Sequence, residues 1–267
     1  MIVDSHVHLW SLDSRPQPWI PAGDLLDRDF TPADLGSAAQ AAGVGRVVLV
    51  QVLNRADETA EHLALDDPLV AGVVGWVDLA RPGSFAGLVG VRHQALAEPD
   101  PAAWVLRHDV RAGMAQLGKL GLVCDLMLRH QHFAAAEETL RSVDGARFVL
   151  DHAGKPPIAS GWGSAESGEW AAAVTSIARR PNALCKLSGL TVLAGPEWTV
   201  ADLKPYAEHL LWAFGPRRLL FGSDWPVCLR AGSYQRTVDA ALELVSGLSS
   251  AERAAVMGEN AVAVYGL

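Results

Sequence analysis

Cysteine is scarce in this chain, which has only Cys124, Cys185 and Cys228 and no CxxC pair. The odd number and wide spacing exclude a disulfide framework and a cysteine zinc site. Cys124 stands in the apolar run LVCDLML, where a thiol packs as a small hydrophobic group. We therefore expect reduced thiols in a cytoplasmic protein.

Long apolar segments and basic segments are also missing. No run of about 18 apolar residues occurs, which argues against a membrane-spanning helix. The N-terminal sequence MIVDSHVHLW has neither the basic region nor the apolar stretch of a signal peptide. The formal net charge is −8 and basic residues do not cluster, so we expect no nucleic-acid or membrane partner. With 50% hydrophobic and 19% charged residues, the composition suits a large core and excludes a disordered chain.

The sequence instead alternates short apolar, β-branched runs with longer stretches rich in Ala, Leu, Glu and Arg. The apolar runs do not alternate strictly with polar residues, which suits parallel strands that are buried on both faces. Strands are predicted at Ile2–Val7, Arg46–Val52, Val70–Val77, Leu88–His93, Leu122–Leu128, Arg147–Asp151, Leu184–Leu187 and Leu219–Gly222.

The stretches between these runs have the apolar spacing of amphipathic helices. A capping box at Ser249–Glu252 opens a last helix near the C-terminus. The other helices are predicted at Asp34–Ala42, Ala56–Leu65, Asp109–Leu120, Phe133–Arg141, Glu169–Arg179, Thr199–Phe214 and Thr237–Val245.

Strands that alternate with helices predict a parallel sheet with helices outside it. A barrel of eight such units needs about 250 residues, so the 267 residues fit one α/β domain, a (β/α)₈ TIM barrel over residues 1–267. The first predicted strand is followed by SHVHLW and not by GxGxxG, so a dinucleotide-binding sheet gains no support.

Active sites of such barrels form at the carboxyl ends of the strands, so polar residues at strand ends are the first candidates. The first strand ends in His6-Val7-His8. Residues two apart in a strand point to the same side. Both imidazoles can therefore face the barrel mouth, where they can hold a divalent metal or polarise a carbonyl group.

His152 follows the sixth strand and Asp224 follows the eighth. A carboxylate at the barrel mouth can take a proton from water or bind a metal. Each residue also has a structural interpretation, since a histidine after a buried strand is often a packing group and Asp224 before Pro226 suits a helix N-cap. In a barrel, His152 and Asp224 would lie at the same mouth as His6 and His8, which favours one site formed by all four residues.

Other strand ends supply further polar residues. Arg92 and His93 end the fourth strand, where Arg92 can bind a substrate oxygen or form an ion pair inside the barrel. His130 and His132 form a second HxH after the fifth strand, for which we expect a loop or helix-start role. Residues at the remaining strand ends that are expected to line the site are Gln51, Asp78, Lys186 and Ser188.

Several segments together identify a family resemblance that spans nearly the whole chain. They are DSHVHLW at 4–10, VVGWVDL at 73–79, GVRHQALAEPDP at 90–101, DHAGKP at 151–156, CKLSGL at 185–190 and FGSDWPV at 221–227. With these segments the chain resembles the amidohydrolase superfamily. Within it, the chain resembles the amidohydrolase-2 group, and in particular the L-fuconolactone and L-rhamnonolactone hydrolases.

The resemblance implies an enzyme that opens a small lactone, most often a sugar lactone, with water. Asp224 would take a proton from the attacking water, His152 would lie near the substrate carbonyl group, and Arg92 and His93 would contact the substrate. Trp10 and Trp225 flank the candidate residues, and their rings are predicted to stack against the sugar.

The resemblance also frames the question of a metal. If one divalent ion such as zinc or manganese is bound, its ligands would come from His6, His8, His152 and Asp224. Binuclear relatives carry a bridging lysine or carboxylate on strand four and a histidine at the end of strand five. This chain has Arg92-His93 and Leu126–Arg129 there, which argues against a binuclear centre. Metal-free catalysis is the other expectation, as in related lactonases.

Two alternatives compete with lactone hydrolysis. A metal-dependent nonoxidative decarboxylase of an aromatic or unsaturated acid would use the same histidines and aspartate, with a firmly bound metal. A non-catalytic barrel would be expected to have lost one of these four residues, and none is lost. The GVRHQ, DHAGKP and GSDWPV segments favour the lactonase.

Overall fold

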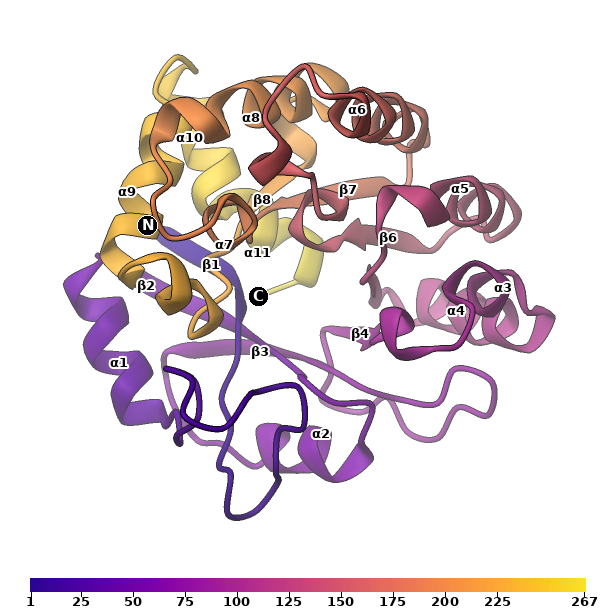
Figure 1. The fold of residues 1–267 in the computed structure, drawn as a ribbon. Coiled ribbons are helices and arrows are strands. Elements are labelled where there is room, and N and C mark those ends of the chain that lie inside the picture. The colour runs from indigo at the N-terminus through magenta and orange to yellow at the C-terminus, as the bar shows by residue number, and fades with distance from the viewer.

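The computed structural model describes residues 1–267 and contains one eight-stranded sheet in the order β1 to β8, with each neighbouring pair parallel. The sheet closes on itself where Val7 bridges Trp225 in parallel. This arrangement confirms the predicted (β/α)₈ barrel (Figure 1). The strands are β1 Ile2–Val7, β2 Val44–Val50, β3 Val70–Gly75, β4 Gly90–His93, β5 Val123–Leu126, β6 Arg147–Leu150, β7 Ala183–Leu187 and β8 Leu219–Phe221.

Helices surround the barrel (Figure 1), and most begin within a few residues of their predicted start. The capping box of Ser249 and Glu252 is present. α3 and α7 were not predicted, because helices of six and five residues are too short for an apolar period to stand out. The helices are α1 Pro32–Ala41, α2 Ala56–Leu63, α3 Pro101–Leu106, α4 His108–Leu120, α5 Phe133–Ser142, α6 Ala165–Ala178, α7 Leu190–Ala194, α8 Val200–Phe214, α9 Tyr234–Leu244, α10 Ser250–Ala254 and α11 Asn260–Tyr265.

The apolar core has two parts. A cluster of 62 buried residues fills the space between the strands and the outer helices. A smaller cluster of 11 lies inside the barrel, where inward-facing valines and leucines of the strands meet Ala261, Val264 and Tyr265 of α11. The C-terminal helix therefore closes the end of the barrel opposite the strand carboxyl ends.

Inside the barrel, an apolar layer is followed by a polar one. Val123, Val149 and Leu184 belong to the inner apolar cluster. The residues two positions further along the same strands are Asp125, Asp151 and Lys186, all nearly or completely buried. Because side chains alternate along a strand, these charged groups face inward, one layer nearer the barrel mouth.

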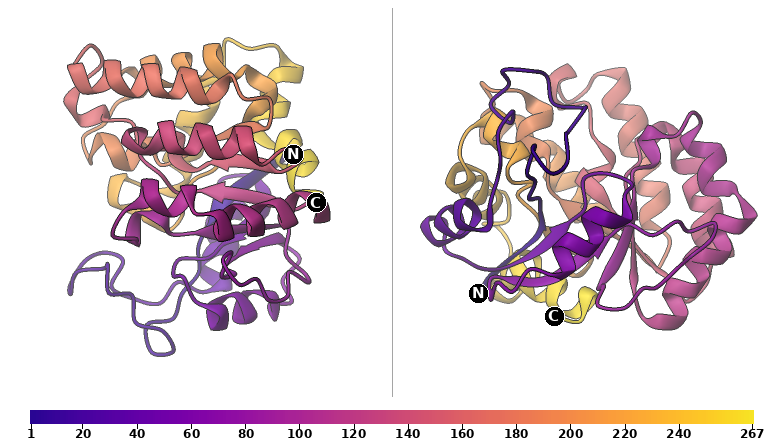
Figure 2. Two further views of the ribbon diagram at one scale, coloured as in Figure 1. Left: turned by 90° about the vertical axis from the view of Figure 1, so that its right-hand side faces the viewer. Right: turned by 90° about the horizontal axis from the view of Figure 1, so that it is seen from below.

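The loops at the two ends of the barrel differ in length. Both termini lie at one end, and the long loop after β1 projects from the other (Figure 2). An antiparallel bridge between Trp10 and Phe30 ties the base of this loop together. The strand carboxyl ends and the extended loop thus share the end where the site residues lie.

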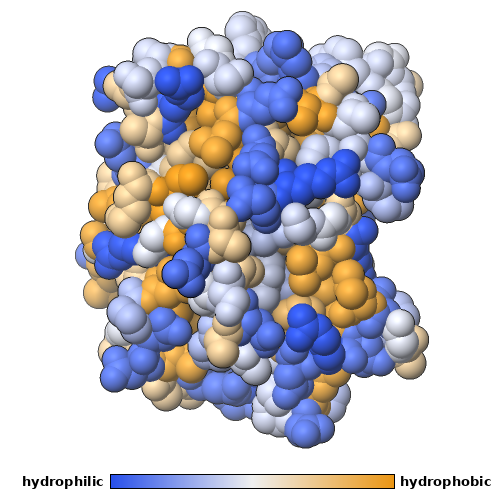
Figure 3. All heavy atoms as spheres, turned by 90° about the vertical axis from the view of Figure 1, so that its left-hand side faces the viewer, coloured by the Kyte–Doolittle hydropathy of each residue, from blue (hydrophilic) through white to orange (hydrophobic).

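The outer surface has the usual mixture of polar and apolar groups. On the side shown in Figure 3, apolar residues form small groups between charged ones. None of the helices has the length and hydrophobicity that crossing a membrane requires. Cys124, Cys185 and Cys228 are all buried and free, in line with the expectation of unpaired thiols.

Candidate active site

A cavity of about 470 Å³ opens at the carboxyl ends of the strands, within the size range of small-molecule sites. Three of the four residues expected to form the site, His8, His152 and Asp224, line it together with Arg92. The rest of the wall consists of Pro18, Trp19, Val52, Leu53, Asn54, Gln94, Ala97, Met127, Lys155 and Val227.

His8 and Asp224 meet across the closure of the barrel, with His8 Nε2 3.2 Å from Asp224 Oδ1. The other ring nitrogen of His8, Nδ1, lies 2.7 Å from the backbone oxygen of Val50. A carbonyl oxygen only accepts hydrogen bonds, so Nδ1 carries a proton and donates it. His8 Nε2 faces Asp224 Oδ1. Either a second proton on Nε2 or a cation bound between the two atoms is needed to hold them this close.

Asp224 is held in position by its backbone. Its φ of 62° lies in the left-handed region, and its N–H donates to His6 O over 2.9 Å. Its side chain has one hydrogen-bond partner, His8, and accepts no backbone N–H of the following 3₁₀ helix. Asp224 is therefore not the helix N-cap that the sequence left open. Burial alone would raise the pKa of Asp224. The charge that His152 acquires at low pH, the hydrogen bond with His8 and the charges of protonated His6 and His8 outweigh burial and hold the pKa below its ordinary range. The carboxylate is ionised at neutral pH.

His152 is also held by unusual backbone geometry, with a φ of 49°. Its Nδ1 lies 2.9 Å from Ser188 Oγ, and its Nε2 lies 3.9 Å from Asp224 Oδ1. Burial lowers the pKa of His152 to about 4, so its imidazole is neutral at neutral pH. A neutral imidazole whose Nδ1 accepts the Ser188 hydroxyl proton presents an N–H at Nε2.

His6 lies behind the cavity wall, fully buried between two cations. Lys186 Nζ is 2.9 Å from its Nδ1, and Arg92 Nη1 is 3.2 Å from its Nε2. Burial, together with the charge of Lys186, holds the pKa of His6 well below its ordinary value. His6 faces His8 edge to face at 4.9 Å, so the HxH pair does converge as its spacing predicts.

The cations beside His6 are themselves fixed by buried carboxylates. Lys186 Nζ lies 2.5 Å from Asp125 and 3.0 Å from Asp151, and Arg92 Nη1 lies 3.0 Å from Asp151. The Tyr265 hydroxyl donates to Asp125 over 2.9 Å. Arg92 thus forms the internal ion pair that the sequence left open, and its side chain also lines the cavity.

His93 lies outside the cavity wall, contrary to its predicted substrate contact. Its ring stacks on Trp104 at 4.2 Å, and its Nδ1 accepts the indole N–H of Trp76. Its Nε2 lies 2.8 Å from Glu98 and 3.2 Å from Asn54 Nδ2. Because Nδ1 accepts from Trp76, Nε2 carries the ring proton and donates it to Glu98, so both ring nitrogens are bonded to protein groups and His93 is not part of the cavity wall.

Trp10 and Trp225 do not line the cavity either, so the prediction that they stack on substrate needs correction. They are 3% and 2% exposed, and both pack edge to face against Phe30. Trp225 is the immediate neighbour of Asp224, and adjacent residues in extended chain point to opposite sides. Trp10 lies beyond the end of β1, where its ring packs on Phe30. Trp19, which is 37% exposed, is the tryptophan in the cavity wall.

Lys155, Asn54 and Gln94 line the cavity but were not singled out from the sequence. Lys155 has a φ of 56°, and its side chain has no hydrogen bond or ion pair in the structure. Burial lowers its pKa, against the opposing charge of Asp224. Its place in the DHAGKP segment, three residues after His152, was the signal that could have identified it.

The second HxH pair belongs to a separate element. His130 and His132 lie in a short 3₁₀ helix before α5, and neither lines the cavity. His132 Nδ1 accepts the backbone N–H of Arg129 over 3.3 Å, a contact at the start of the helix. This position matches the loop or helix-start role expected from the sequence.

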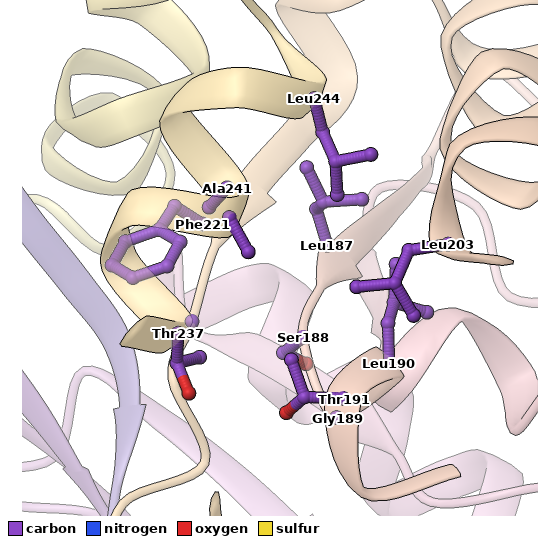
Figure 4. Close-up of a pocket in the computed structure, with 12 residues that line it drawn as sticks. Leu187, Ser188, Gly189, Leu190, Thr191, Leu203, Phe221, Thr237, Ala241 and Leu244 are labelled. Atoms are coloured by element: carbon purple, nitrogen blue, oxygen red, sulfur yellow. The ribbon is translucent and has the colours of Figure 1, made fainter. Parts of the chain in front are cut away.

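A second cavity lies between β7, β8 and helices α7, α8 and α9, and Figure 4 shows its lining. Its volume is about 20 Å³, room for a water molecule and not for a sugar. Its polar wall includes Ser188, the partner of His152, beside Gly189. This void therefore belongs to the packing beneath the candidate site.

The donor atoms at the barrel mouth fit a divalent metal. The ligand atoms of His6, His8 and Asp224 lie within 4.8 Å of one another, as do those of His6, Asp151 and His152. Ligands about 2 Å from a tetrahedral zinc ion lie a little over 3 Å apart, close to the His8–Asp224 separation of 3.2 Å. The hydrogen bond from His8 Nδ1 to a backbone carbonyl is also the usual support for a metal-binding histidine.

Comparison with known proteins gives close relatives over almost the full chain. Residues 3–267 match the amidohydrolase family. The chain is 37% identical over 285 residues to the L-fucono-1,5-lactonase of Burkholderia multivorans, covering 99% of this chain and 96% of that protein. It is 37% identical over 246 residues to the L-fucono-1,5-lactonase of Burkholderia ambifaria, covering 87% and 82% of the two chains.

Solved structures agree with these relatives. Two crystal structures of an amidohydrolase from Burkholderia multivorans, one with bound HEPES and one with bound zinc, superpose on this chain with a TM-score of 0.92 at 36% identity. They cover 100% of this chain and 99% of theirs. The family resemblance read from the sequence is thus confirmed, and the chain belongs to the amidohydrolase family.

Proposed function

We propose that the chain hydrolyses a sugar lactone to the open-chain hydroxy acid, with L-fucono-1,5-lactone or a close relative as substrate. The observation that carries this proposal is an ionised Asp224 beside a neutral His152 at the wall of one cavity. The identity of 37% to two L-fucono-1,5-lactonases supports the same substrate class.

Asp224 acts as the general base in this proposal. Its carboxylate removes a proton from a water molecule as the water oxygen bonds to the lactone carbonyl carbon. The bond between that carbon and the ring oxygen then breaks, and the proton returns from Asp224 to the ring oxygen, which becomes a hydroxyl group. The product is a carboxylic acid, which ionises and releases one proton.

The developing oxyanion needs hydrogen-bond donors aimed at it. His152 donates through Nε2–H when Ser188 donates its hydroxyl proton to Nδ1, an arrangement that fits the 2.9 Å contact. Lys155 lines the same cavity and has no protein partner for its ammonium group, so it is free to bind the carbonyl oxygen. These two residues are proposed to stabilise the charge.

A single divalent ion, zinc or manganese, would be held by His8 and Asp224 and would supply Lewis-acid polarisation when bound. The residues named above suffice for water activation and oxyanion stabilisation without it. We therefore propose that catalysis persists after metal removal. Decarboxylation of an aromatic or unsaturated acid is the less supported alternative, because the relatives at 37% identity are lactonases.

A pH-indicator assay of acid release tests this function. The panel contains L-fucono-, L-rhamnono- and L-galactonolactones, with and without chelator, against a blank without enzyme that measures spontaneous hydrolysis. We expect rapid acid release on at least one sugar lactone that persists in chelator. No release above the blank on any lactone, with zinc or manganese added, would contradict the proposal and lead to assays on aromatic acids.

A further inference from the structure

We propose that Trp170 is a positioning residue of the site, because its indole N–H holds the left-handed turn that carries His152 and Lys155 into the cavity. The proposal rests on the function proposed above, in which these two residues stabilise the oxyanion. Trp170 itself stands on the outer helix α6 and does not line the cavity. It would act only through the turn.

The turn that follows β6 has an unusual backbone. Four consecutive residues have a positive φ, namely His152 at 49°, Ala153 at 52°, Gly154 at 67° and Lys155 at 56°. Three of the four have a Cβ atom, which the left-handed region disfavours because it comes too close to the following carbonyl oxygen. A strained run of this kind persists only where the surrounding structure holds it, and such runs cluster at functional sites.

This turn places two cavity residues on one side. The backbone N–H of Lys155 donates to the backbone oxygen of His152 over 2.8 Å, which closes a turn of three residues. Side chains three residues apart in so tight a turn lie on the same side. In extended chain they would point to opposite sides. His152 and Lys155 line the cavity together, so opening of the turn would remove one of them from it.

Trp170 supplies the directional contact that holds the turn closed. Its Nε1 donates to the backbone oxygen of Ala153 over 2.8 Å, and no other side chain donates to a backbone oxygen of residues 152–155. Trp170 is 0% exposed, so water does not compete for this hydrogen bond. Its ring packs against Tyr206 of α8 with centroids 5.4 Å apart, which fixes the direction of the N–H.

Phe133 of α5 packs against another residue of the turn but contributes shape alone. A Cβ atom added to Gly154 would overlap the ring of Phe133, so only glycine fits between the ring and the turn. This apolar contact limits the space of the turn and forms no hydrogen bond with it. The orientation of the turn therefore depends on the N–H of Trp170.

Trp170→Phe tests the proposal, because it removes the N–H and keeps an aromatic ring. We expect kcat on the best lactone of the panel to fall at least about tenfold, with KM within about threefold of wild type, because the displaced donors act in the transition state. The matched control is Trp198→Phe, since Trp198 is also buried and donates through Nε1 to a backbone oxygen, that of Ala231, over 2.7 Å. Wild-type kcat in Trp170→Phe, or equal losses in the two variants, would overturn the proposal.

A rescue variant distinguishes positioning from packing. Glycine adopts a φ of 52° without the penalty that alanine has there, so Ala153→Gly makes the turn less dependent on outside support. Added to Trp170→Phe, it is expected to raise kcat at least about threefold above the single variant. No recovery would assign the loss to packing of the indole ring and contradict the proposal.

A crystal structure reports the turn without any substrate, and it also covers the case in which Trp170→Phe does not fold. Trp170→benzothienylalanine keeps both fused rings and has sulfur in place of the N–H. We expect the turn to leave the left-handed region and the contact between His152 Nδ1 and Ser188 Oγ to be lost. An unchanged turn would overturn the proposal. A displaced turn in an enzyme whose wild type hydrolyses no lactone would contradict the proposed function alone.

Discussion

Gly189 lies directly against the imidazole of His152. A Cβ atom added to this glycine would come within 3.0 Å of Cβ, Cγ and Nδ1 of the histidine. The glycine also has a φ of 69°, in the left-handed region. The residue after Ser188 must therefore be glycine for His152 to keep its contact with the Ser188 hydroxyl.

Gly189→Ala is expected to lower kcat at least tenfold, because the methyl group displaces the imidazole from its position beside Asp224. The matched control is Gly121→Ala, which has a similar φ of 73° and no atom within 4 Å of the added Cβ. Both variants should lose about 1 kcal/mol of stability from the left-handed backbone. Equal activity in the two would mean that the position of His152 is unimportant.

Lys155→Met removes the unpaired cation from the cavity wall while keeping most of the side-chain volume. If the ammonium group stabilises the oxyanion, kcat falls by about 10²-fold and KM changes little. Steady-state kinetics on the best lactone of the panel measures both values, with exposed Lys204→Met as the control for charge. A rise in KM alone would assign Lys155 to binding of the resting substrate.

Two tryptophan substitutions separate binding from packing. Trp19→Ala should raise KM with little loss of stability, because its ring is partly exposed in the cavity wall. Trp225→Ala should cost about 3–5 kcal/mol of stability, because its ring is buried against Phe30. Kinetics and urea unfolding of both variants check this assignment. The opposite result would restore Trp225 as the stacking residue.

The barrel could be predicted from the sequence because each buried parallel strand is a short apolar run between amphipathic helices. β1 has the predicted bounds, whereas β2 begins and ends two residues earlier than predicted, at Val44 and Val50. The predicted strand ends differ from the observed ones because the residues just after each strand are buried at the barrel mouth, so the sequence reads as if the strand continued. Gln51, for example, is fully buried just beyond β2.

The candidate site could be predicted only as far as strand ends determine it. His8, His152, Asp224 and Arg92 reach the cavity because the barrel brings their strand ends together. Lys155 and Trp19 lie in loops, and loop conformation has no regular residue spacing from which the direction of a side chain could be predicted. The pairing of Lys186 with both Asp125 and Asp151 required the three-dimensional register.

His62 on α2 makes stability depend on pH. It is 3% exposed, and burial lowers its pKa from an ordinary 6.5 to about 4. As the pH falls below 6.5, His62 becomes protonated in the unfolded chain, whereas in the folded chain it stays neutral down to about pH 4. Stability is therefore lost as the pH falls through this window. Each pH unit in this window costs about 1.4 kcal/mol, so the full effect is about 3 kcal/mol.

Urea unfolding at pH 7.5 and pH 5 measures this dependence. Wild type should lose stability between the two pH values, and His62→Gln should lose less by about 2 kcal/mol. The comparison with exposed His108→Gln removes the contribution of a surface imidazole. An unchanged pH dependence in His62→Gln would mean that other buried groups control acid sensitivity.

The most direct test of the account is the hydrolysis of L-fucono-1,5-lactone by wild type and Asp224→Asn, measured side by side as acid release in the presence of chelator. The substitution keeps the size of the side chain and removes its basicity. The account predicts rapid turnover by wild type and a drop of at least about 10³-fold in kcat for Asp224→Asn, with unchanged circular dichroism. Wild-type turnover by the folded variant would contradict the assignment of Asp224 as the base.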